Sequence, residues 1–436
     1  GRVALNGARQ STRAIVATFR RRGFLDFLWY TKYETTDPQI AYIAKRVPWP
    51  TNPDFTAWEA GNCAKTWWGT NGTDGRKLAR YSGQYNPGSG WVNWGPTPCA
   101  DVAWAPGDAI NGPVHSKDSL LICGNPSFGQ SAADRIETEA PVGQGLRNAG
   151  PAPGEALWSC PNAYGPVMNG TLKEAADPMD MPPSNGALAS VVSPCCHFVG
   201  KTRIQFNSDG SMTVKNPAMG LDDAPMTQPA NGVIYVSNDT TSSCPAYNPA
   251  NTDAAPDACG TLRVKGTYTQ NMTLAAENDI VVTGDLEYAS GSTALLGLIA
   301  QKYARVWHPT GTTTAQWYGT ASGAATFNAA GQCNSGDTGA LATIEIDAAI
   351  LTIDHSFLVD NWTCGSVRRV ELKVVGAIAQ AFRGPVAGAS SGYQKNYIYD
   401  TRLKYRAPPN FLNPVQAAWR VVRVSEQAGA VNIQGT

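Results

Sequence analysis

The chain carries little charge. Only 16% of its 436 residues are Asp, Glu, Lys or Arg, and 34 basic residues balance 34 acidic ones. A chain without net charge does not attract polyanions over its whole surface, so nucleic acid is not expected as a partner. The local exception is a group of arginines near the start, which we interpret as the solvated face of a basic helix: Arg9, Arg13, Arg20, Arg21 and Arg22.

Long hydrophobic runs are also missing. No stretch approaches the roughly 20 apolar residues that a membrane-spanning helix needs, and no signal peptide is visible. The chain opens with Gly1 rather than Met. We therefore expect a hydrophobic anchor to have been removed, and we expect contact with a membrane only through that missing N-terminal anchor.

Cofactor and metal motifs are scarce. The sequence has no Gly-x-x-x-x-Gly-Lys-Ser/Thr loop of the kind that cradles phosphates. Its one close Cys/His group is Cys195-Cys196-His197, and adjacent cysteines rarely ligate one metal ion together. The sequence therefore predicts no cofactor and no metal.

The cysteines indicate the cellular compartment in which the protein resides. There are ten of them without metal-binding spacing, which favours disulfides formed outside the cytoplasm. Proximity and flanking turns predict three pairs: Cys63 with Cys99, Cys244 with Cys259, and Cys333 with Cys364. The pairing of Cys123, Cys160, Cys195 and Cys196 stays open. The sequence thus predicts an extracellular or cell-surface protein.

Short runs of alternating aliphatic and polar residues recur between Gly260 and Val386. Alternation buries one side of a strand, whereas denser runs such as 280–282 and 295–300 are typical of strands covered on both faces. The amphipathic helices of βαβ units are missing, so these strands favour coils stacked along one axis. The sequence predicts a mainly β protein, a β-solenoid, with ten residues pointing into one elongated core: Leu262, Val264, Ile280, Val282, Leu296, Leu298, Ile344, Ile346, Leu372 and Val374.

Four segments are expected along the chain. Residues 1–45 form an N-terminal α-helix and an aromatic cap, in which Phe24–Tyr30 buries against the end of the solenoid or a neighbouring subunit. Residues 46–100 form an irregular Trp/Gly/Pro-rich excursion. The solenoid spans 101–390, with a long loop at 140–190 and an insertion at 307–340, and residues 391–436 close the molecule. Within the solenoid, Arg203–Phe206 and Ser211–Val214 are expected to form a hairpin.

Three stretches together resemble a family of bacterial surface proteins related to the pilins of type IV pilus assembly. They are Arg22–Pro38, Gly112–Pro126, and Leu295–Ala300 continuing to Val306–Pro309. The resemblance covers nearly the whole chain. It implies an extracellular β-helix domain preceded by a prepilin-like hydrophobic helix, and it brings no catalytic residues. This sequence lacks that helix, so pilus-type assembly is implied by the resemblance alone.

One carboxylate pair is a candidate for catalysis. Glu345 and Asp347 share a strand face about 7 Å apart, where Asp354, His355 or Arg369 from nearby coils could join them, as in the polysaccharide-degrading enzymes that use paired carboxylates. The alternative is a row of polar residues on the wet face of a strand. We favour the alternative, because similar alternation recurs elsewhere without consistent acid–base logic.

Two histidines are weaker candidates. His115 beside Asp118 could act as a proton shuttle or supply half of a metal site, and His308 precedes Pro309. For both, a histidine that hydrogen-bonds backbone atoms to fix a turn is the simpler interpretation.

The sequence therefore favours a non-catalytic extracellular structural or adhesive component of the cell surface, associated with a pilus. Its expected partners are further copies of itself or other surface-fibre subunits. Two alternatives remain. A carbohydrate-binding adhesin predicts an exposed tryptophan groove and a polysaccharide partner, whereas a polysaccharide-degrading β-helix enzyme predicts clustered carboxylates with perturbed pKa values.

Overall fold

The computed structural model describes residues 13–37, 39–40, 84–85, 92–93, 102–148, 164–239, 244–245, 247, 256–308, 343–362, 370–387 and 392–428. This part of the chain is mainly β, as the sequence predicts, and short 3-10 helices connect some of the strands. No helix within it has the length and apolar character to cross a membrane. The expected excursion at 46–100 and insertion at 307–340 fall largely outside the described residues.

Two ladders of parallel strands build the body of the protein. The first ladder contains, in spatial order, β13 (His197–Val199), β17 (Val233–Ser237), β19 (Met272–Ala276), β21 (Leu296–Ala300), β24 (Ala349–Thr352), β26 (Glu371–Arg383), β2 (Trp29–Thr36), β6 (Val114–Ser116), β9 (Arg135–Thr138) and β12 (Thr171–Lys173). Each strand pairs with its neighbours in parallel, because successive passes of the chain run in the same direction.

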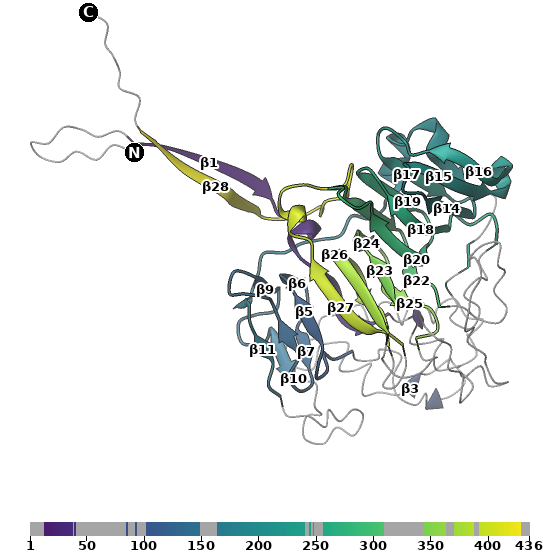
Figure 1. The fold of residues 1–436 in the computed structure, drawn as a ribbon. Coiled ribbons are helices and arrows are strands. Elements are labelled where there is room, and N and C mark those ends of the chain that lie inside the picture. Colours follow the sequence, from purple (N-terminus) through teal and green to yellow (C-terminus); the bar gives the residue numbers. More distant parts are fainter. Residues whose placement is uncertain are drawn as a thin grey trace, which may run out of the picture.

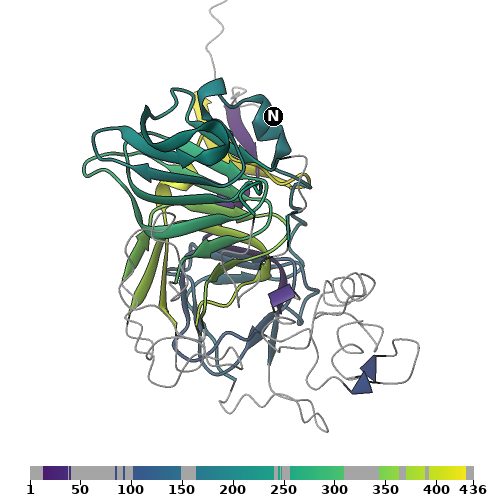
Figure 2. The same cartoon turned by 90° about the vertical axis from the view of Figure 1, so that its right-hand side faces the viewer.

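The second ladder runs beside the first and shares β26 with it. It contains β14 (Thr202–Phe206), β18 (Leu262–Tyr268), β20 (Ile280–Tyr288), β22 (Ala304–Val306) with β25 (Phe357–Val359), β23 (Ile344–Ile346), β26, β27 (Gln394–Tyr399), β5 (Ala109–Asn111), β8 (Ser127–Phe128) and β11 (Val167–Met168). The two ladders join into one curled sheet (Figure 2).

The remaining elements lie at the margins. The antiparallel strands β15 (Ser211–Asn216) and β16 (Leu221–Thr227) extend the sheet beyond β14, so the predicted hairpin from Arg203 to Val214 is confirmed. Three further pairs are separate from the sheet: β7 (Leu120–Ile122) with β10 (Leu146–Asn148), β3 (Gln84–Tyr85) with β4 (Val92–Asn93), and β1 (Arg13–Arg21) with β28 (Trp419–Ala428). The 3-10 helices are η1 (Phe24–Asp26), η2 (Gly186–Ser190), η3 (Pro194–Cys196), η4 (Pro217–Met219) and η5 (Thr401–Lys404).

The chain enters the sheet in its middle rather than at an end. From β2 it steps through β5–β12 to one end, returns along residues 174–196 to the opposite end, and then proceeds from β13 back to β26 and β27. In Figure 1 the blue strands β5–β11 accordingly lie on one side of β26 and β27, and the teal and green strands lie on the other. Asn185 holds the returning segment against the sheet, because its side-chain amide donates to the carbonyl oxygens of Ala276 at 2.8 Å and Ile299 at 3.2 Å.

The two halves of the sheet meet at a seam around β2. Leu28 donates its backbone N–H to Pro113 in one half (2.8 Å) and accepts one from Ile378 in the other (2.7 Å). Gly112 permits this close contact. A Cβ atom at position 112 would lie 2.7 Å from the Cβ of Tyr399 and 3.0 Å from that of Leu28, closer than non-bonded carbons pack.

One hydrophobic cluster fills the interior of the curled sheet. All ten residues predicted to share a core belong to it, so that prediction is confirmed. The ladders place them in register: Leu298 pairs with Leu274 on one side and with Ile350 on the other. Parallel pairing repeats each inward position in the next strand, which produces continuous columns of aliphatic side chains.

The prediction for residues 1–45 is wrong in two respects. Arg13–Arg21 is a strand rather than a helix, because β28 offers an edge with which its β-branched and aromatic residues pair. The aromatic run from Phe24 to Tyr30 does not cap an end or face a partner. It is buried at the seam, where β2 lies between β26 and β6.

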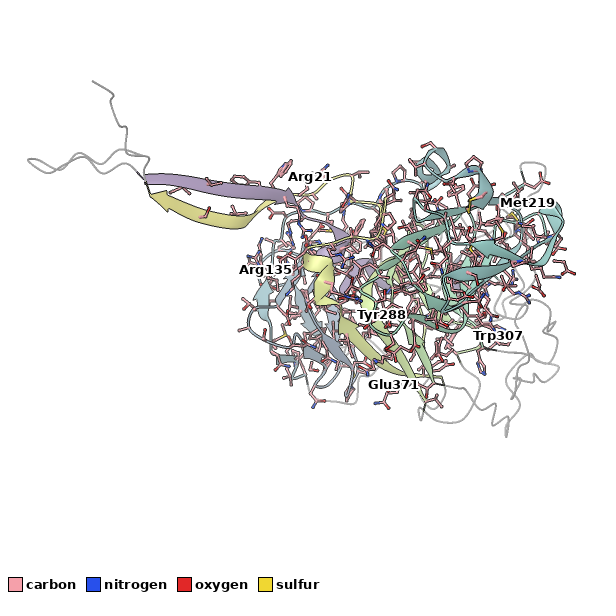
Figure 3. All side chains as sticks on the ribbon, turned by 45° about the horizontal axis from the view of Figure 1, so that its top comes forward. Arg21, Arg135, Met219, Tyr288, Trp307 and Glu371 are labelled. Atoms are coloured by element: carbon pink, nitrogen blue, oxygen red, sulfur yellow. A yellow bond between two sulfur atoms is a disulfide. The ribbon has the colours of Figure 1, made fainter. Side chains whose placement is uncertain are left out.

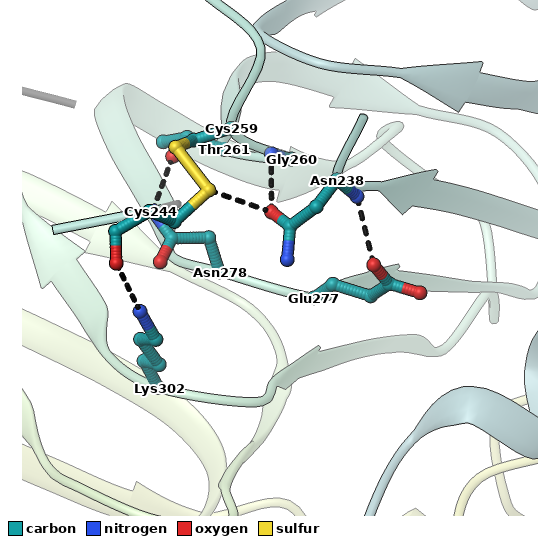
Figure 4. Close-up of a disulfide and its surroundings, with 8 residues drawn as sticks. All are labelled: Asn238, Cys244, Cys259, Gly260, Thr261, Glu277, Asn278 and Lys302. Atoms are coloured by element: carbon teal, nitrogen blue, oxygen red, sulfur yellow. Dashed lines mark hydrogen bonds between the residues drawn. A yellow bond between two sulfur atoms is a disulfide. The ribbon is translucent and has the colours of Figure 1, made fainter. Parts of the chain in front are cut away.

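The disulfides that the structure describes fasten the loops. Cys244 and Cys259 are joined, as expected, beside the β17–β18 connection (Figure 4). Asn238 lies next to this bond, and its side-chain oxygen accepts the Gly260 N–H at 2.8 Å. Cys195 and Cys196 bond to each other, and Cys123 is also in a disulfide. Cys63, Cys99, Cys333 and Cys364 lie outside the described residues, so their pairing stays a prediction.

Candidate functional site: the terminal ribbon and its base

The strands β1 and β28 form an antiparallel ribbon that projects from the body (Figures 1 and 3). Residues directly opposite each other in an antiparallel pair point to the same face. Phe19 pairs with Val421, Ala17 with Val424, and Arg21 with Trp419. Since Ile15, Ala17 and Phe19 alternate along β1 at intervals of two, their side chains and those of their partners occupy one face.

This face is open to solvent and apolar between its ends, which carry the register positions of Arg13, Glu426 and Arg21. Its five large hydrophobic residues are between 51% and 69% exposed: Ile15, Phe19, Trp419, Val421 and Val424. The opposite face is more polar, since there Arg20 pairs with Arg420 and Thr18 with Arg423, and Val16, 47% exposed, is its one exposed large hydrophobic residue among those described. The ribbon is therefore amphipathic, and its apolar face has no cover within the described residues.

Three consecutive arginines attach the ribbon to the body. Arg20 forms an ion pair with Asp26 in η1, and Arg21 donates to the carbonyl oxygen of Val415 at 3.1 Å. Arg22 is buried and forms an ion pair with Glu137 of β9. The sequence interpretation of a basic helix face is therefore wrong, because Arg20 and Arg21 belong to a strand; Arg21 is exposed, as expected, whereas Arg22 is buried.

His115 of β6 lies beside Arg22 in a buried network. Its Nδ1 is 3.2 Å from Glu137 Oε2, and its Nε2 is 3.2 Å from Glu139 Oε1. Its ring stacks on Tyr30 with centroids 5.6 Å apart. The simpler sequence interpretation, a histidine that fixes a turn through backbone atoms, is thus wrong. Asp118 is not its partner either, because that carboxylate accepts the backbone N–H groups of Glu34 and Ser119.

The charges around Glu137 decide its protonation. Burial alone raises the pKa of this carboxyl, but the hydrogen bond with His115 and the charge of Arg22 outweigh burial and hold the pKa at about 2. Glu137 therefore stays ionised at any ordinary pH. The base of the ribbon is consequently a fixed ionic cluster within the first ladder.

A second connection ties the base to the other terminal strand. Lys117, directly after β6, forms an ion pair with Asp180. The backbone N–H of Asp180 donates to Gln416 at 3.1 Å, and that of Val415 donates to Asp180 at 3.0 Å. Both strands of the ribbon are therefore held at their base. Arg22 links β1 to β9, and Lys117 and Asp180 hold the segment that precedes β28.

The carboxylates predicted as a catalytic pair lie elsewhere, Glu345 in β23 and Asp347 directly after it. Glu345 bonds to Lys373, with 2.6 Å between oxygen and Nζ. Asp347 is only 7% exposed, and its Oδ1 has no hydrogen-bond partner among the described residues. Burial, followed by the charges of Glu345 and Glu287, raises the pKa of Asp347 to about 7. A general acid must reach its substrate, and this buried carboxyl does not.

The structure does not bring the other candidates to this pair. His355 Nδ1 donates to Asp37 Oδ2 at 2.8 Å, and Asp354 accepts from the side chain of Gln301 at 2.8 Å. Arg369 lies outside the described residues.

His308 contacts the backbone oxygen of Asn361 at 3.2 Å, which agrees with a histidine that fixes a turn. Within the described ranges no group of three or more His, Cys, Asp or Glu side chains is arranged to hold a metal ion.

The sequence from Gly388 to Gly392 has the form Gly-x-Ser-x-Gly that occurs in serine hydrolases. A nucleophile elbow needs a strand before it and a helix after it. Here the segment lies between the strands β26 and β27, and residues 388–391 fall outside the described residues. The motif therefore gives no support to hydrolase chemistry.

The buried Asp347 makes stability depend on pH. Its pKa is about 7 in the fold, against 3.8 for an aspartate side chain free in water. The folded state therefore keeps a proton that the unfolded chain has lost, and stability falls as pH rises from about 4 to about 7. We expect Asp347→Asn to be more stable than the wild type by about 2–4 kcal/mol at about pH 8, with little difference near pH 4.

Urea unfolding of both proteins across this pH range measures the effect. Asp222→Asn is the control, because the Asp222 side chain is 80% exposed and its replacement is expected to change stability by less than about 1 kcal/mol. Parallel pH profiles for the wild type and Asp347→Asn would contradict a buried, protonated Asp347.

Comparisons with known proteins add little to this geometry. No family model matches the sequence, and no curated protein matches it. Among solved structures, the competence-associated pilin ComZ from Thermus thermophilus aligns over 96% of this chain and 78% of its own, with 9% identity and a TM-score of 0.29. A TM-score this low carries no argument about a shared fold or function.

Proposed function

We propose that the protein is an extracellular, non-catalytic structural component of a cell surface, associated with a pilus, and that the terminal ribbon serves attachment and assembly. The observation that carries this proposal is the ribbon. Both terminal strands leave the body together, and they present one exposed apolar face. Apolar patches of this kind on a soluble protein mark contact sites.

The body is suited to a structural role. We infer that the two parallel ladders are successive faces of β-solenoid coils, since each pass of the chain adds one strand to each ladder. Such a body needs no cofactor, because stacked coils bury their own core. Cysteines paired in disulfides support an exported location, since reducing compartments keep thiols free.

The alternatives have less support. The tryptophans that could form a sugar-binding groove, from Trp49 to Trp94, lie outside the described residues. The carboxylates that could cleave a polysaccharide are either paired with Lys373 or buried. The association with a pilus rests on the sequence resemblance given above.

A deletion within the ribbon tests the proposal. Removing residues 13–19 and 421–428 leaves the attachment of Arg20, Arg21 and Arg22 in place, so the body is expected to fold. We expect most of the truncated protein to be released from the cell surface into the medium, while the full chain is retained. The control is Val142→Asp, an exposed apolar residue in a loop of the body. Retention of a folded, truncated protein would contradict the role of the ribbon.

Incubation of the full chain with common polysaccharides tests the absence of catalysis. We expect no release of oligosaccharides. Cleavage that disappears in Glu345→Gln or Asp347→Asn would show that the carboxylates act as an enzyme site and that the non-catalytic assignment is wrong.

A further inference from the structure

Two cysteines that are adjacent in the chain are bonded to each other. Cys195 and Cys196 belong to η3, directly before β13, and their Cα atoms are 3.8 Å apart. Ordinary disulfides join Cα atoms that are about 4.4–6.8 Å apart, a separation that neighbouring residues of a chain do not reach. The proposed role of the ribbon does not use this bond.

The bond between the two neighbours contributes little to the stability of the fold. A disulfide stabilises a protein chiefly because it closes a loop and so restricts the unfolded chain, and the gain grows with the length of the loop. The bond between Cys244 and Cys259 joins residues 15 positions apart (Figure 4), whereas Cys195 and Cys196 are one position apart. A bond between neighbours restricts the unfolded chain very little.

Other contacts hold the segment that carries the two cysteines. Asn185 anchors its start to β19 and β21, and Asn231 Nδ2 donates to the carbonyl oxygen of Val191 at 2.7 Å. Cys196 is buried in the main hydrophobic cluster, and its backbone N–H donates to the carbonyl oxygen of Ser193 at 2.9 Å. The segment therefore has contacts that remain when the S–S bond is broken.

The bond can be reached from solvent at one of its two residues. Cys195 is the only exposed cysteine among those that the structure describes, since Cys123, Cys196 and Cys259 are buried and Cys244 is half-buried. A thiolate must reach a disulfide sulfur to attack it, and exposed disulfides are the ones that exchange readily. Among the described cysteine residues, this pair therefore combines access from solvent with a small contribution to stability.

We propose that Cys195–Cys196 is a thiol–disulfide exchange site that accepts two electrons from a dithiol and, once reduced, loosens the start of the first ladder without unfolding the body. A thiolate of the dithiol attacks Cys195 Sγ, the S–S bond breaks, and its electron pair leaves on Cys196 Sγ. The second thiolate then attacks the sulfur of the dithiol in the mixed disulfide and releases Cys195. The two protons that the dithiol loses end on the cysteine sulfurs, and the dithiol becomes a disulfide.

Reduction affects β13 because the bond lies at the start of this strand. While they are bonded, Cys195 and Cys196 form a small ring that restricts the backbone immediately before His197. The strand has three residues and lies at the end of the first ladder, where it pairs with β17. Elements with few neighbours open more easily than those in the core. Opening of the ring is therefore expected to loosen η3 and β13, and to leave β21 unchanged.

Limited reduction of the native full chain with dithiothreitol tests the exchange site. After an acid quench, free thiols are labelled with N-ethylmaleimide in guanidinium chloride, and peptide mapping by mass spectrometry gives the rate at which each bond opens. We expect the bond of Cys195 and Cys196 to open at least about ten times faster than that of Cys244 and Cys259. Equal rates, or earlier opening of the second bond, would overturn the proposal.

Two matched double variants distinguish this site from a structural disulfide. Cys195→Ser with Cys196→Ala removes the first bond, and Cys244→Ser with Cys259→Ala removes the second, with alanine at the buried position in both. We expect urea unfolding close to the wild-type midpoint for the first variant and a clearly lower midpoint for the second. A first variant that does not fold, or that loses as much stability as the second, would show that its bond is structural and would overturn the proposal.

Hydrogen exchange in the oxidised and reduced wild type tests the effect on the ladder. On reduction, we expect exchange at least about threefold faster at the amides of Cys196 and Phe198, and no change at Leu298 of β21. Unchanged exchange at Cys196 and Phe198, or equal acceleration at Leu298, would overturn the local loosening. None of these measurements depends on the ribbon or on retention at the cell surface, so this inference and the proposed function can fail separately.

Discussion

Replacing Leu298 with Asp is expected to abolish folding. Leu298 is completely buried in β21, between Leu274 of β19 and Ile350 of β24. The substitution removes a buried leucine, which costs about 2–5 kcal/mol, and it adds a charge whose burial without a partner costs several kcal/mol more. Together these costs are of the same size as the roughly 5–15 kcal/mol that stabilises a typical domain.

Two matched variants separate burial from side-chain chemistry. Leu298→Met conserves volume and is expected to cost less than about 1.5 kcal/mol. Leu172→Asp introduces the same charge on β12, where the native leucine is 37% exposed, and is expected to leave the protein folded. Far-UV circular dichroism and urea unfolding measure all three. If Leu298→Asp unfolded cooperatively at the same urea concentration as the wild type, the columns of aliphatic side chains in the core would not be continuous.

The core could be predicted from the sequence because its signal is local. Period-two alternation in Leu262–Val264 or Ile344–Ile346 fixes which side chains share a face, and the stacking of parallel strands then brings all inward residues into one interior. The hairpin from Arg203 to Val214 also depended on neighbouring residues, since a four-residue turn sets its register.

The ribbon could not be predicted in this way. In Arg13–Arg21 the apolar residues Ile15 and Phe19 are four positions apart, which fits a helix, but Ile15, Ala17 and Phe19 fit a strand equally well. The choice between the two is made by β28, about four hundred residues later in the sequence. A local pattern contains no information about that partner.

The seam was missed for the same reason. Sequence order favours coils added one after another, which would put Phe24–Tyr30 at an end of the stack. The structure instead inserts β2 between β26 and β6. The partners of His115 could have been suspected from Glu137 and Glu139, which lie two apart and therefore share a face near β6. The ion pair of Glu137 with Arg22 could not be predicted, because it depends on the order of the strands in the ladder.

Replacing Glu137 with Gln is expected to destabilise the protein by about 3–5 kcal/mol, because it removes one partner of a buried ionic group. Arg22 loses its ion pair and His115 loses the carboxylate at Nδ1. The effect should be concentrated at the ribbon, since Arg22 is the residue that links β1 to β9. Hydrogen exchange is therefore expected to become faster at the amides of Ile15–Phe19 than at those of β21.

The pH dependence of this change distinguishes a charge effect from a packing effect. The pKa of Glu137 is lowered in the fold from 4.5 to about 2, so its contribution is fully present above the unfolded value and is lost as pH falls between those two values. The wild type and Glu137→Gln should thus differ at neutral pH and converge in acid. Asp177→Asn is the control, because it removes a partially exposed carboxylate 3.8 Å from the same arginine and is expected to cost less than about 1 kcal/mol. If Glu137→Gln and Asp177→Asn proved equally stable at neutral pH, the ribbon would have to be held by the backbone hydrogen bonds of Val415 and Asp180 rather than by the buried charge of Glu137.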